Sequence, residues 1–461
     1  MTIWQPDLDR SKPLYLAIAD AMMRDVESGI LQKGARLPPQ RDLAWKLGVT
    51  LGTVTRAYKE AETRGLLEGE VGRGSFVRSR AHVASLSEPS AEAAGLMDLS
   101  HAIPPPVVKS EELDAAMQSV MRDPRKLDLL DYAPPEGFHL HRRMATEWLK
   151  RSNIEVAEKD VVISAGAHLG LITVLEAIGE AGEGVFAERT NYALLRTTFK
   201  NTHLQPVSVE MDQDGMMPEA LDRAAAQNKA RIIYLVPTLQ NPTTGTMSAR
   251  RREDIVSIAR KRDLTIVEDD IFRLLDARVQ PPTFYELAPE RTFHITSLSK
   301  TLAPGLRIGF LVSPQGQDRI LRSHIRNMAA RTVGITGEIA RYWIESGMAQ
   351  TILERSRSEL ESRRNLFMEI FKDSVFRCEP GAPYAWLKLP DHWSANRFTQ
   401  ALASRKIKVS PESVFDLNGT GGNHIRVCFG APRVGWQMRQ AFEVIAALMQ
   451  GSELDDYTPV A

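Results

Sequence analysis

Short apolar segments alternate with helical segments from Asp98 onward, and this alternation constrains the fold more than any other feature of the sequence. It is typical of a mainly parallel sheet whose two faces are covered by helices, so we expect an α/β domain. More α/β patterning after Arg341, with a last helix over Trp436–Met449, predicts a smaller C-terminal α/β subdomain. The predicted strands are Val161–Ser164, Gly184–Ala187, Arg231–Val236, Leu264–Glu268 and Thr292–Thr296, and the clearest helices between them are Ala167–Gly179 and Ala249–Lys261.

The chain is predicted to divide into three parts. Residues 1–78 carry short helices and a small hairpin, whereas residues 98–461 carry the α/β pattern. Between them, residues 79–97 are rich in small and polar side chains and have no apolar stripe long enough for a packed helix. A segment of that composition is typical of an exposed linker.

Charge and cysteine content exclude several classes of protein. The 58 Lys and Arg residues balance 58 Asp and Glu residues, so any contact with nucleic acid must come from a local patch. Two cysteines, Cys378 and Cys428, cannot make a disulfide framework or a cysteine zinc cluster, and we expect buried thiols in a reducing compartment. Met1–Arg10 lacks the apolar run of a signal peptide, and no stretch approaches the ~20 apolar residues of a membrane span. A cytoplasmic protein without a membrane partner or a bound metal is expected.

Residues 37–64 have the pattern of a helix-turn-helix. Apolar residues fall on one face of a short helix that Gly48 ends, and Thr50 is placed to cap a second helix over residues 51–64. The buried face of that second helix would consist of Val54, Ala57, Tyr58 and Ala61. Two helices joined by a tight glycine turn have helix-turn-helix geometry.

A small hairpin follows the two helices. Two apolar strand ends flank Gly72-Arg73-Gly74, and the glycines permit a tight turn whose tip projects Arg73. Such a hairpin after a helix-turn-helix predicts a wing.

The L-P-x-x-R-x-L-A spacing and the G-x-G of the hairpin resemble the GntR family of winged helices. By matched position, this resemblance implies that the residues facing DNA are Arg41, Thr50, Thr53 and Arg73. Arg41 and Arg73 would hold phosphates or the minor groove, and the start of the second helix would enter the major groove. Leu51 stands where these proteins often have an arginine, which leaves base readout open. A winged helix that serves only in oligomerisation is the alternative.

The most specific motif is S-L-S-K-T-L-A-P-G-L-R-I-G-F, over Ser297–Phe310. Lys300 follows a predicted strand, at the end of an α/β sheet where cofactors gather. Its amine can form a Schiff base with an aldehyde cofactor. Ser297 and Arg307 flank it with a hydroxyl and a guanidinium, and both groups suit a phosphate. A lysine after a strand is usually a surface lysine, so this hypothesis depends on the neighbouring motifs.

Three earlier segments supply matching groups. Asp269 comes just past a predicted strand, where a carboxylate can pair with a protonated pyridine nitrogen, although an acidic turn is the simpler explanation of this residue alone. Asn241, before Pro242, ends another strand, with its amide available to a ring hydroxyl. Gly166-Ala167-His168 opens a helix, and backbone N–H groups at such an end attract phosphate.

In this order the motifs N-P-T-x-G, D-x-x-aromatic and S-x-S-K-x-x-x-P-G-x-R resemble the fold-type I aminotransferases, over essentially all of residues 98–450. The resemblance implies the cofactor pyridoxal 5'-phosphate (PLP), held by Lys300, with Asp269 at the pyridinium and Asn241 at the 3-hydroxyl. The residues implied around the ring and phosphate are Tyr192, which would stack on the ring, with Ala167, His168, Ser297, Ser299 and Arg307 around the phosphate. Tyr132 matches a tyrosine that reaches the phosphate from the partner subunit, and Arg426 matches the arginine that binds the α-carboxylate of the substrate.

One position departs from the aminotransferase pattern. The family usually has a tyrosine two or three residues after the aspartate, where this chain has Ile271 and Phe272. Neither side chain can donate a hydrogen bond to the 3-oxygen of the cofactor, so its ionisation is tuned differently. We expect cofactor binding to survive and transamination to suffer.

A GntR-type winged helix joined by a linker to an aminotransferase-like domain resembles the MocR/PdxR regulators along the whole chain. That resemblance implies a homodimeric, PLP-dependent transcriptional regulator of double-stranded DNA with paired half-sites. Its effector would be a small amino compound, such as an amino acid or a polyamine-like amine, or PLP itself, and Arg426 favours a carboxylate. The alternative is a working aminotransferase with a vestigial DNA-binding module, and a weak transaminase half-reaction fits both.

Overall fold

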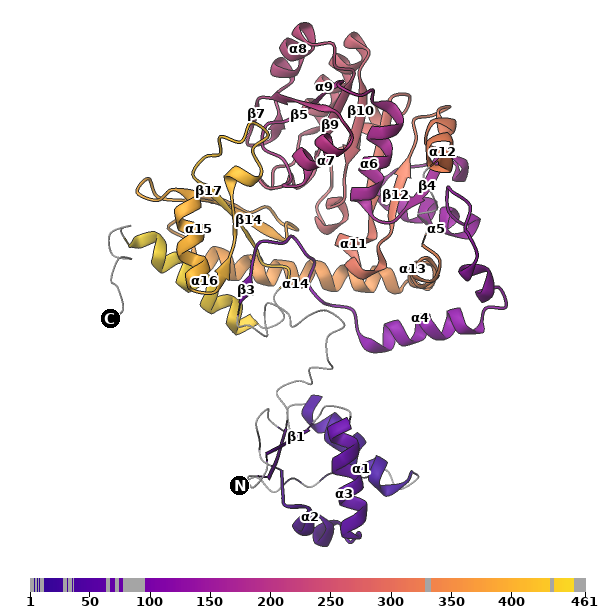
Figure 1. Ribbon diagram of the computed structural model, residues 1–461, viewed down its shortest axis with the longest axis vertical. Coiled ribbons are helices and arrows are strands. Elements are labelled where there is room, and N and C mark those ends of the chain that lie inside the picture. Colours follow the sequence, from indigo (N-terminus) through magenta and orange to yellow (C-terminus); the bar gives the residue numbers. More distant parts are fainter. Residues whose placement is uncertain are drawn as a thin grey trace. The chain divides into compact units, whose positions relative to one another are not determined.

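The structure is a computed structural model that describes residues 4, 6, 8, 12–27, 31, 35, 37–63, 67–70, 74–77, 96–327, 333–431 and 435–451. The chain forms two compact units, Met1–Ala94 and Gly95–Ala461, and Figure 1 draws the helices of the first in indigo. Within the described ranges, no helix combines the length and the apolar character that crossing a bilayer requires.

The first unit consists of three helices and a hairpin. Its elements are α1 (Leu14–Glu27), α2 (Gln40–Leu47), α3 (Leu51–Thr63) and the antiparallel strands β1 (Leu67–Glu70) and β2 (Gly74–Val77). Gly48 has a left-handed φ of 65° between α2 and α3, which confirms the predicted glycine turn. The predicted buried face of α3 is confirmed, because Val54, Ala57, Tyr58 and Ala61 are at most 1% exposed. This face packs on Ile18 and Met22 of α1.

Two predictions fall at the edges of the described residues. Arg73, at the predicted wing tip between β1 and β2, lies outside them. The predicted linker, 79–97, also lies outside them as far as residue 95. Its last residue belongs to β3 (Met97–Asp98), which pairs in parallel with β15 (Ile407–Lys408). The end of that segment is therefore part of the second unit.

The second unit is built on a seven-stranded sheet of order β4-β12-β11-β10-β9-β5-β6. Its strands are β4 (Val161–Ser164), β5 (Gly184–Glu188), β6 (Gln205–Val209), β9 (Ile232–Leu235), β10 (Thr265–Asp269), β11 (Thr292–Ser297) and β12 (Gly309–Val312). Strand β12 is antiparallel to both of its neighbours, β11 and β4, and the other neighbouring pairs in this sheet are parallel. The predicted mainly parallel sheet is confirmed, and each of the five predicted strands lies within one residue of its observed ends.

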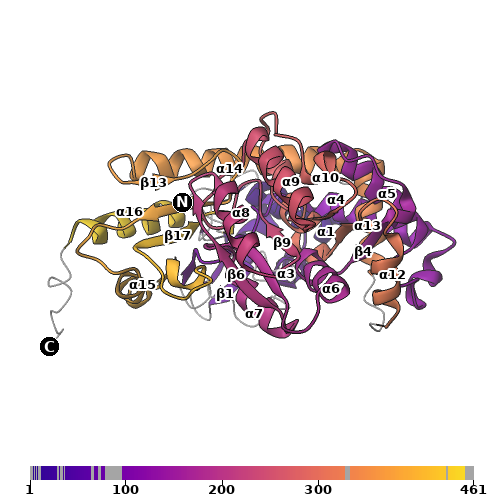
Figure 2. The same ribbon diagram turned by 90° about the horizontal axis from the view of Figure 1, so that it is seen from above.

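Helices cover both faces of this sheet. One face holds α6 (Ala167–Ile178), α7 (Leu195–Asn201) and α12 (Asp318–Asn327), and the other holds α8 (Pro218–Gln227), α9 (Ala249–Arg262) and α10 (Phe284–Leu287). Figure 2 shows α9 and α7 on opposite sides of β9. Alternation along the strand explains this, because Ile232 and Tyr234 join one apolar cluster while Ile233 and Leu235 join the other.

The remaining elements surround this core. Helix α5 (His139–Leu149) packs on β4, and α13 (Ile335–Glu345) packs on α5 and on α4 (Ser110–Arg122). Helix α11 (Leu298–Thr301) directly follows β11, and a short hairpin is formed by β7 (Met211–Asp212) and β8 (Gly215–Met216). The long helix α14 (Met348–Ile370) extends from the large sheet to a second sheet (Figure 1).

That second sheet forms the predicted smaller C-terminal subdomain. Its four antiparallel strands follow the order β13-β14-β17-β16. They are β13 (Phe376–Arg377), β14 (Tyr384–Lys388), β17 (His424–Cys428) and β16 (Ser410–Pro411), accompanied by α15 (Ala395–Ser404) and α16 (Gly435–Gln450). The last of these helices confirms the one expected over Trp436–Met449.

Candidate functional site

A cavity of about 240 Å³ lies at the carboxyl ends of the central strands of the large sheet. It brings together nine of the residues predicted to bind a cofactor: Ala167, His168, Tyr192, Asn241, Asp269, Ser297, Ser299, Lys300 and Arg307. Asp269 is the last residue of β10 rather than just past it, and Ser297 is the last residue of adjacent β11. Parallel pairing of these strands places their ends at one edge, which is where α/β folds bind ligands.

Lys300 lies in α11, directly after β11. Its Nζ donates a hydrogen bond to the carbonyl oxygen of Ala102 at 2.5 Å and lies 6.0 Å from the centre of the Phe272 ring. Burial, followed by the positive charge of Arg426, lowers the pKa of the Lys300 amine to about 8. An amine with this lowered pKa is uncharged in a larger fraction of molecules at neutral pH than an ordinary lysine is, and the uncharged amine is the form that attacks a carbonyl carbon.

Asp269 is buried, and one of its two carboxylate oxygens accepts a hydrogen bond. The hydroxyl of Tyr234, on β9, donates to Asp269 Oδ2 at 2.8 Å. The other oxygen, Oδ1, is buried and has no hydrogen-bond partner among the described residues. Burial raises the pKa of Asp269 to about 6 although the Tyr234 hydroxyl lowers it. An unpartnered buried carboxylate oxygen in a cavity is a place for a cationic N–H donor.

Asn241 and Arg426 meet beside the cavity. Arg426, on β17 of the smaller subdomain, donates from Nη1 to Asn241 Oδ1 at 2.6 Å and from Nη2 to the Ser100 carbonyl at 2.5 Å. Its Nε is buried without a partner among the described residues. Arg426 is 6% exposed, so a free donor on this guanidinium is costly unless an acceptor binds there.

An anion cradle forms between α6 and Arg307. Gly166, the N-cap of α6, has φ 96°, and a Cβ there would lie 2.8 Å from Arg307 Nη2. The guanidinium therefore sits over the first turn of α6, and Nη2 donates to the Ala165 carbonyl at 3.2 Å. Ser299 Oγ is buried with no partner among the described residues. A helix N-terminus, an arginine and a free hydroxyl together suit a phosphate.

Two predicted phosphate neighbours have other contacts. Ser297 lines the cavity, but its hydroxyl already donates to the Ile308 carbonyl at 2.9 Å and accepts from the Ser299 N–H. His168 Nδ1 lies 2.8 Å from the hydroxyl of Tyr192, and this contact fixes both rings at the cavity wall. Burial, followed by the positive charge of Arg307, lowers the pKa of His168.

The position that departs from the aminotransferase pattern also faces the cavity. Ile271 and Phe272 both line it, and Phe272 packs edge-on against Tyr384 with ring centres 5.7 Å apart. The wall at this point therefore presents carbon atoms to any bound group.

Sequence patterns missed two parts of the site. Tyr234 lies inside a strand that was predicted only as apolar core. Successive side chains of a strand point to opposite faces, and this alternation could have shown which face of the sheet Tyr234 occupies. Ser100 and Ala102 act through backbone carbonyls, which carry no side-chain signal in a sequence.

Tyr132 is placed apart from this cavity. It does not line the cavity of its own chain, and it is 94% exposed. Its predicted contact with a partner subunit stays a prediction.

The predicted DNA-facing residues of the first unit lie on α2 and at the start of α3. Arg41 is exposed on the first turn of α2, and Thr50 is exposed at the turn between the helices. Thr50 Oγ1 accepts from the Thr53 N–H at 3.2 Å, which confirms the predicted cap. The two hydroxyls also lie 2.8 Å apart. Arg73 is outside the described residues.

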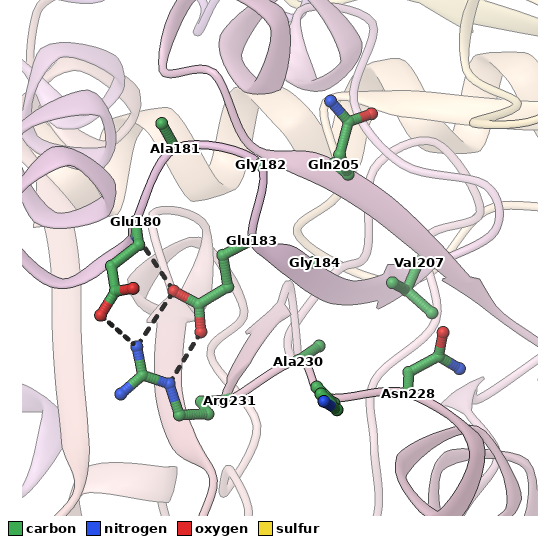
Figure 3. A pocket seen from close by; sticks show the side chains of 11 residues that line it. Glu180, Ala181, Gly182, Glu183, Gly184, Gln205, Val207, Asn228, Ala230 and Arg231 are labelled. Atoms are coloured by element: carbon green, nitrogen blue, oxygen red, sulfur yellow. Dashed lines mark hydrogen bonds and ion pairs between the residues drawn. The ribbon is translucent and has the colours of Figure 1, made fainter.

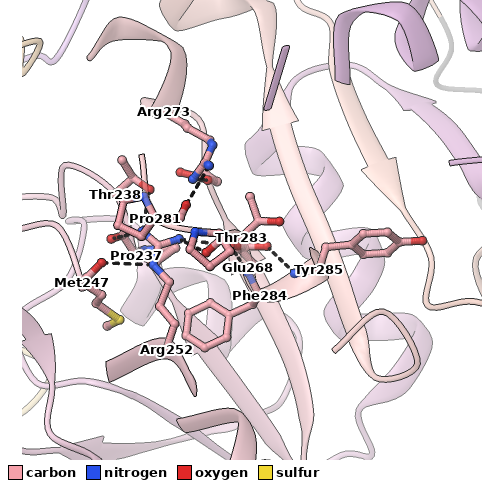
Figure 4. A network of polar contacts seen from close by, with 12 residues as sticks. Pro237, Thr238, Met247, Arg252, Glu268, Arg273, Pro281, Thr283, Phe284 and Tyr285 are labelled. Carbon is pink, nitrogen blue, oxygen red and sulfur yellow. Dashed lines mark hydrogen bonds and ion pairs between the residues drawn. The ribbon is translucent and has the colours of Figure 1, made fainter. Parts of the chain in front are cut away.

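A second cavity lies at the opposite end of the sheet strands. It measures about 700 Å³ and is lined by residues at the starts of β5 and β6 and before β9. Arg231 crosses it, with bonds of 3.0 Å to Glu183 and 3.1 Å to Glu180 (Figure 3). Lys229 also lines the cavity, so its two positive charges balance the two carboxylates, and the cavity is remote from the strand ends that carry Lys300.

Relatives of the chain include HTH-type transcriptional regulators. It is 26% identical to the uncharacterized HTH-type transcriptional regulator YdeF of Bacillus subtilis, over 99% of this chain and 97% of that protein. It is 25% identical to the HTH-type pyridoxine biosynthesis transcriptional regulator PdxR of Corynebacterium glutamicum, over 77% and 78%.

Solved structures share the fold of the second unit. The kynurenine aminotransferase of Pyrococcus horikoshii has a TM-score of 0.72 at 21% identity, covering 85% of this chain and 99% of that one. LysN, an α-aminoadipate aminotransferase of Thermus thermophilus, has a TM-score of 0.71 at 23% identity, covering 79% and 95%.

Two family models match in sequence order. Residues 14–77 match the gntR family of bacterial regulatory proteins. Residues 94–445, most of the sequence, match aminotransferase class I and II. The chain therefore belongs to the aminotransferase class I and II family, and it carries a GntR-family domain on the N-terminal side of its aminotransferase domain.

Proposed function

We propose that this protein is a PLP-dependent transcriptional regulator that binds duplex DNA through its first unit and an amino compound through its second. The observation that carries the proposal is the presence, in one chain, of a GntR-family domain and a buried lysine at the strand ends of an aminotransferase-family domain.

The residues of the cavity fit PLP. Lys300 offers an amine to the aldehyde, and the unpartnered Asp269 Oδ1 offers an acceptor to the pyridine N–H. The cradle of α6, Ser299 and Arg307 offers donors to the phosphate. When bound, PLP supplies a carbonyl that bonds reversibly to primary amines and a ring that withdraws electrons from them.

Arg426 gives the site its preference among amino compounds. Its unpartnered Nε and its two other nitrogens suit a carboxylate, which an arginine can bind with two parallel hydrogen bonds. Asn241 holds the guanidinium in place at 2.6 Å. An amino acid therefore suits the site better than a simple amine, and PLP itself is the remaining candidate signal.

Both cations of the site also hold the backbone that follows the predicted linker. Lys300 binds the Ala102 carbonyl and Arg426 binds the Ser100 carbonyl, directly after β3. If Lys300 held a cofactor and Arg426 held a carboxylate, neither side chain would be as available to these two backbone carbonyls. Occupation of the site would thus release residues 100–102 and, through β3, change the restraint on the linker. A ligand that changes such a restraint shifts the populations of the DNA-binding arrangements.

The exposed apolar surface of the second unit suits a second copy of the chain. Exposed apolar residues recur along α4 and the turn after it: Leu113, Met117, Met121, Leu127 and Leu130. Tyr132 follows them. An apolar surface of this kind is typical of a subunit interface, and a homodimer would place two first units for paired half-sites.

The carbon-lined wall at Ile271 and Phe272 favours regulation over turnover. A phenol at that position would stabilise one ionisation state of the bound cofactor, and neither side chain can donate a hydrogen bond. The site holds the groups for binding an amino acid, but its wall at Ile271 and Phe272 has no phenol that could tune repeated proton transfer.

The lowered pKa of Lys300 predicts the pH dependence of PLP capture. We expect the rate to rise with pH and to level off above about pH 8, because only the uncharged amine reacts. Roughly a quarter of amines with this pKa are uncharged at pH 7.5, against roughly a thousandth for an ordinary lysine. Stopped-flow absorbance of the PLP-free protein mixed with PLP measures this rate. A rate that still rises about tenfold per unit beyond pH 9 would exclude the lowered pKa.

The proposed function is tested by DNA retardation. Purified protein with bound PLP should retard duplex DNA from the region upstream of its own gene at about 0.1 M salt, with unrelated duplex as competitor. Equal retardation of both duplexes would mean that the first unit confers no sequence preference, and the proposal would fail.

A further inference from the structure

The first turn of α3 presents an apolar side chain to solvent. Leu51 is its first residue and is 43% exposed. The hydroxyls of Thr50 and Thr53, beside Leu51, have hydrogen-bond partners within the turn. Thr50 Oγ1 accepts from the Thr53 N–H and lies 2.8 Å from Thr53 Oγ1. Leu51 is therefore the exposed apolar side chain at this turn, between exposed Thr50 and Gly52.

Residues further along the same helix are also engaged with their own unit. The hydroxyl of Thr55 donates to Gln40 Oε1 at 2.8 Å. The guanidinium of Arg56 stacks on the Tyr15 ring, 3.9 Å from its centre. Leu51 is exposed while both of these contacts are in place.

Gly52 follows Leu51, and packing within the protein does not explain it. Within the described part of the chain, a Cβ at this position would meet only Thr50 Oγ1 within 4 Å, at 3.9 Å, apart from the backbone of its own helix. Glycine inside a helix lowers its stability relative to alanine because it loses more backbone freedom on folding. A helical glycine in open space is explained when another molecule must approach the backbone closely.

We propose that Leu51 and Gly52 form the sequence-reading surface of the DNA-binding unit, with Leu51 packed on the C5-methyl group of a thymine and Gly52 admitting the helix deep into the major groove. The proposal rests on the proposed DNA-binding function. In the major groove, thymine is the base that presents a methyl group, and apolar side chains recognise it by contact. The first residues of the second helix of a helix-turn-helix are those that contact base edges.

The experiment uses the full-length protein with bound PLP. Duplexes enriched from a random library by the wild-type protein are prepared with each thymine replaced in turn by deoxyuridine, which removes only the methyl group. We expect one thymine in each half-site whose replacement weakens binding about threefold to tenfold. In Leu51→Ala the same replacement should change affinity less than about 1.5-fold, because the methyl group has lost its contact.

Leu14→Ala is the matched control. Leu14 is also the first residue of a helix and is 36% exposed. This variant should retain the full preference for thymine over deoxyuridine. Full preference in Leu51→Ala as well, or no deoxyuridine effect in the wild-type protein, would overturn the role of Leu51.

Gly52→Ala separates DNA contact from folding. It should slow amide hydrogen exchange across α3, measured by mass spectrometry on the full chain, because alanine stabilises an exposed helix. The same variant should bind the enriched duplex about tenfold more weakly, because the added methyl group holds the helix away from the bases. Unchanged or tighter DNA binding would overturn the role of Gly52. Failure of the library to enrich any duplex would instead refute the proposed DNA-binding function, and this inference with it.

Discussion

Lys300→Ala is expected to yield a colourless protein that still binds its DNA but no longer responds to amino compounds. Lys300 is the buried amine in the cavity, and its substitution removes the covalent attachment of PLP. We expect apparent affinity for PLP to fall at least about a hundredfold, which corresponds to about 2.7 kcal/mol. Absorbance after incubation with PLP and gel filtration measures the loss.

Lys229→Ala is the control for this variant. Lys229 is exposed at the second cavity, at the far end of the sheet. It should retain the absorbance band and the ligand response. An intact visible band in Lys300→Ala would show that a different amine holds the cofactor.

Gly430→Ala is expected to be the most destabilising small substitution of the second unit. A Cβ at Gly430 would lie 1.8 Å from the Ile103 carbonyl oxygen and 3.0 Å from its carbon. These are backbone atoms, so the chain around Ile103 must shift to make room for the methyl group. Such a clash costs about 3 kcal/mol, and urea unfolding would measure it.

The same displacement should disturb the cofactor site. Residues 100–102 carry the carbonyls that Lys300 and Arg426 bind, so we expect Gly430→Ala to weaken the effect of amino acids on DNA affinity. Gly451→Ala is the control, because among the described residues its Cβ would meet only Leu448 O, at 3.8 Å. If Gly430→Ala keeps wild-type stability and response, residues 100–104 do not couple the site to the linker.

Local chemistry explains which parts of the site could be predicted from the sequence. Asp269 ends one apolar strand, and Asn241 and Lys300 come after two others. Parallel strands end at one edge, so the meeting of the three residues follows from their order along the chain. The helix-turn-helix was predictable for a similar reason, because Gly48 and the cap at Thr50 are local signals.

Long-range backbone contacts explain what could not be predicted. Ser100 lies 326 positions from Arg426 in the chain, and Ala102 lies 198 from Lys300. Their carbonyls are common to every residue, so no side-chain pattern marks them. The hydrogen bond from Tyr234 to Asp269 depends on strand order, which places β9 beside β10.

The most direct test of the account measures DNA affinity and visible absorbance on one sample. The protein is compared without PLP, with PLP, and with PLP plus each of the protein amino acids or a simple diamine. We predict a visible band after addition of PLP, and at least one amino compound that shifts this band and changes DNA affinity about fivefold or more. A protein that stays colourless with PLP, or whose DNA affinity is the same in all three states, would contradict the central claim.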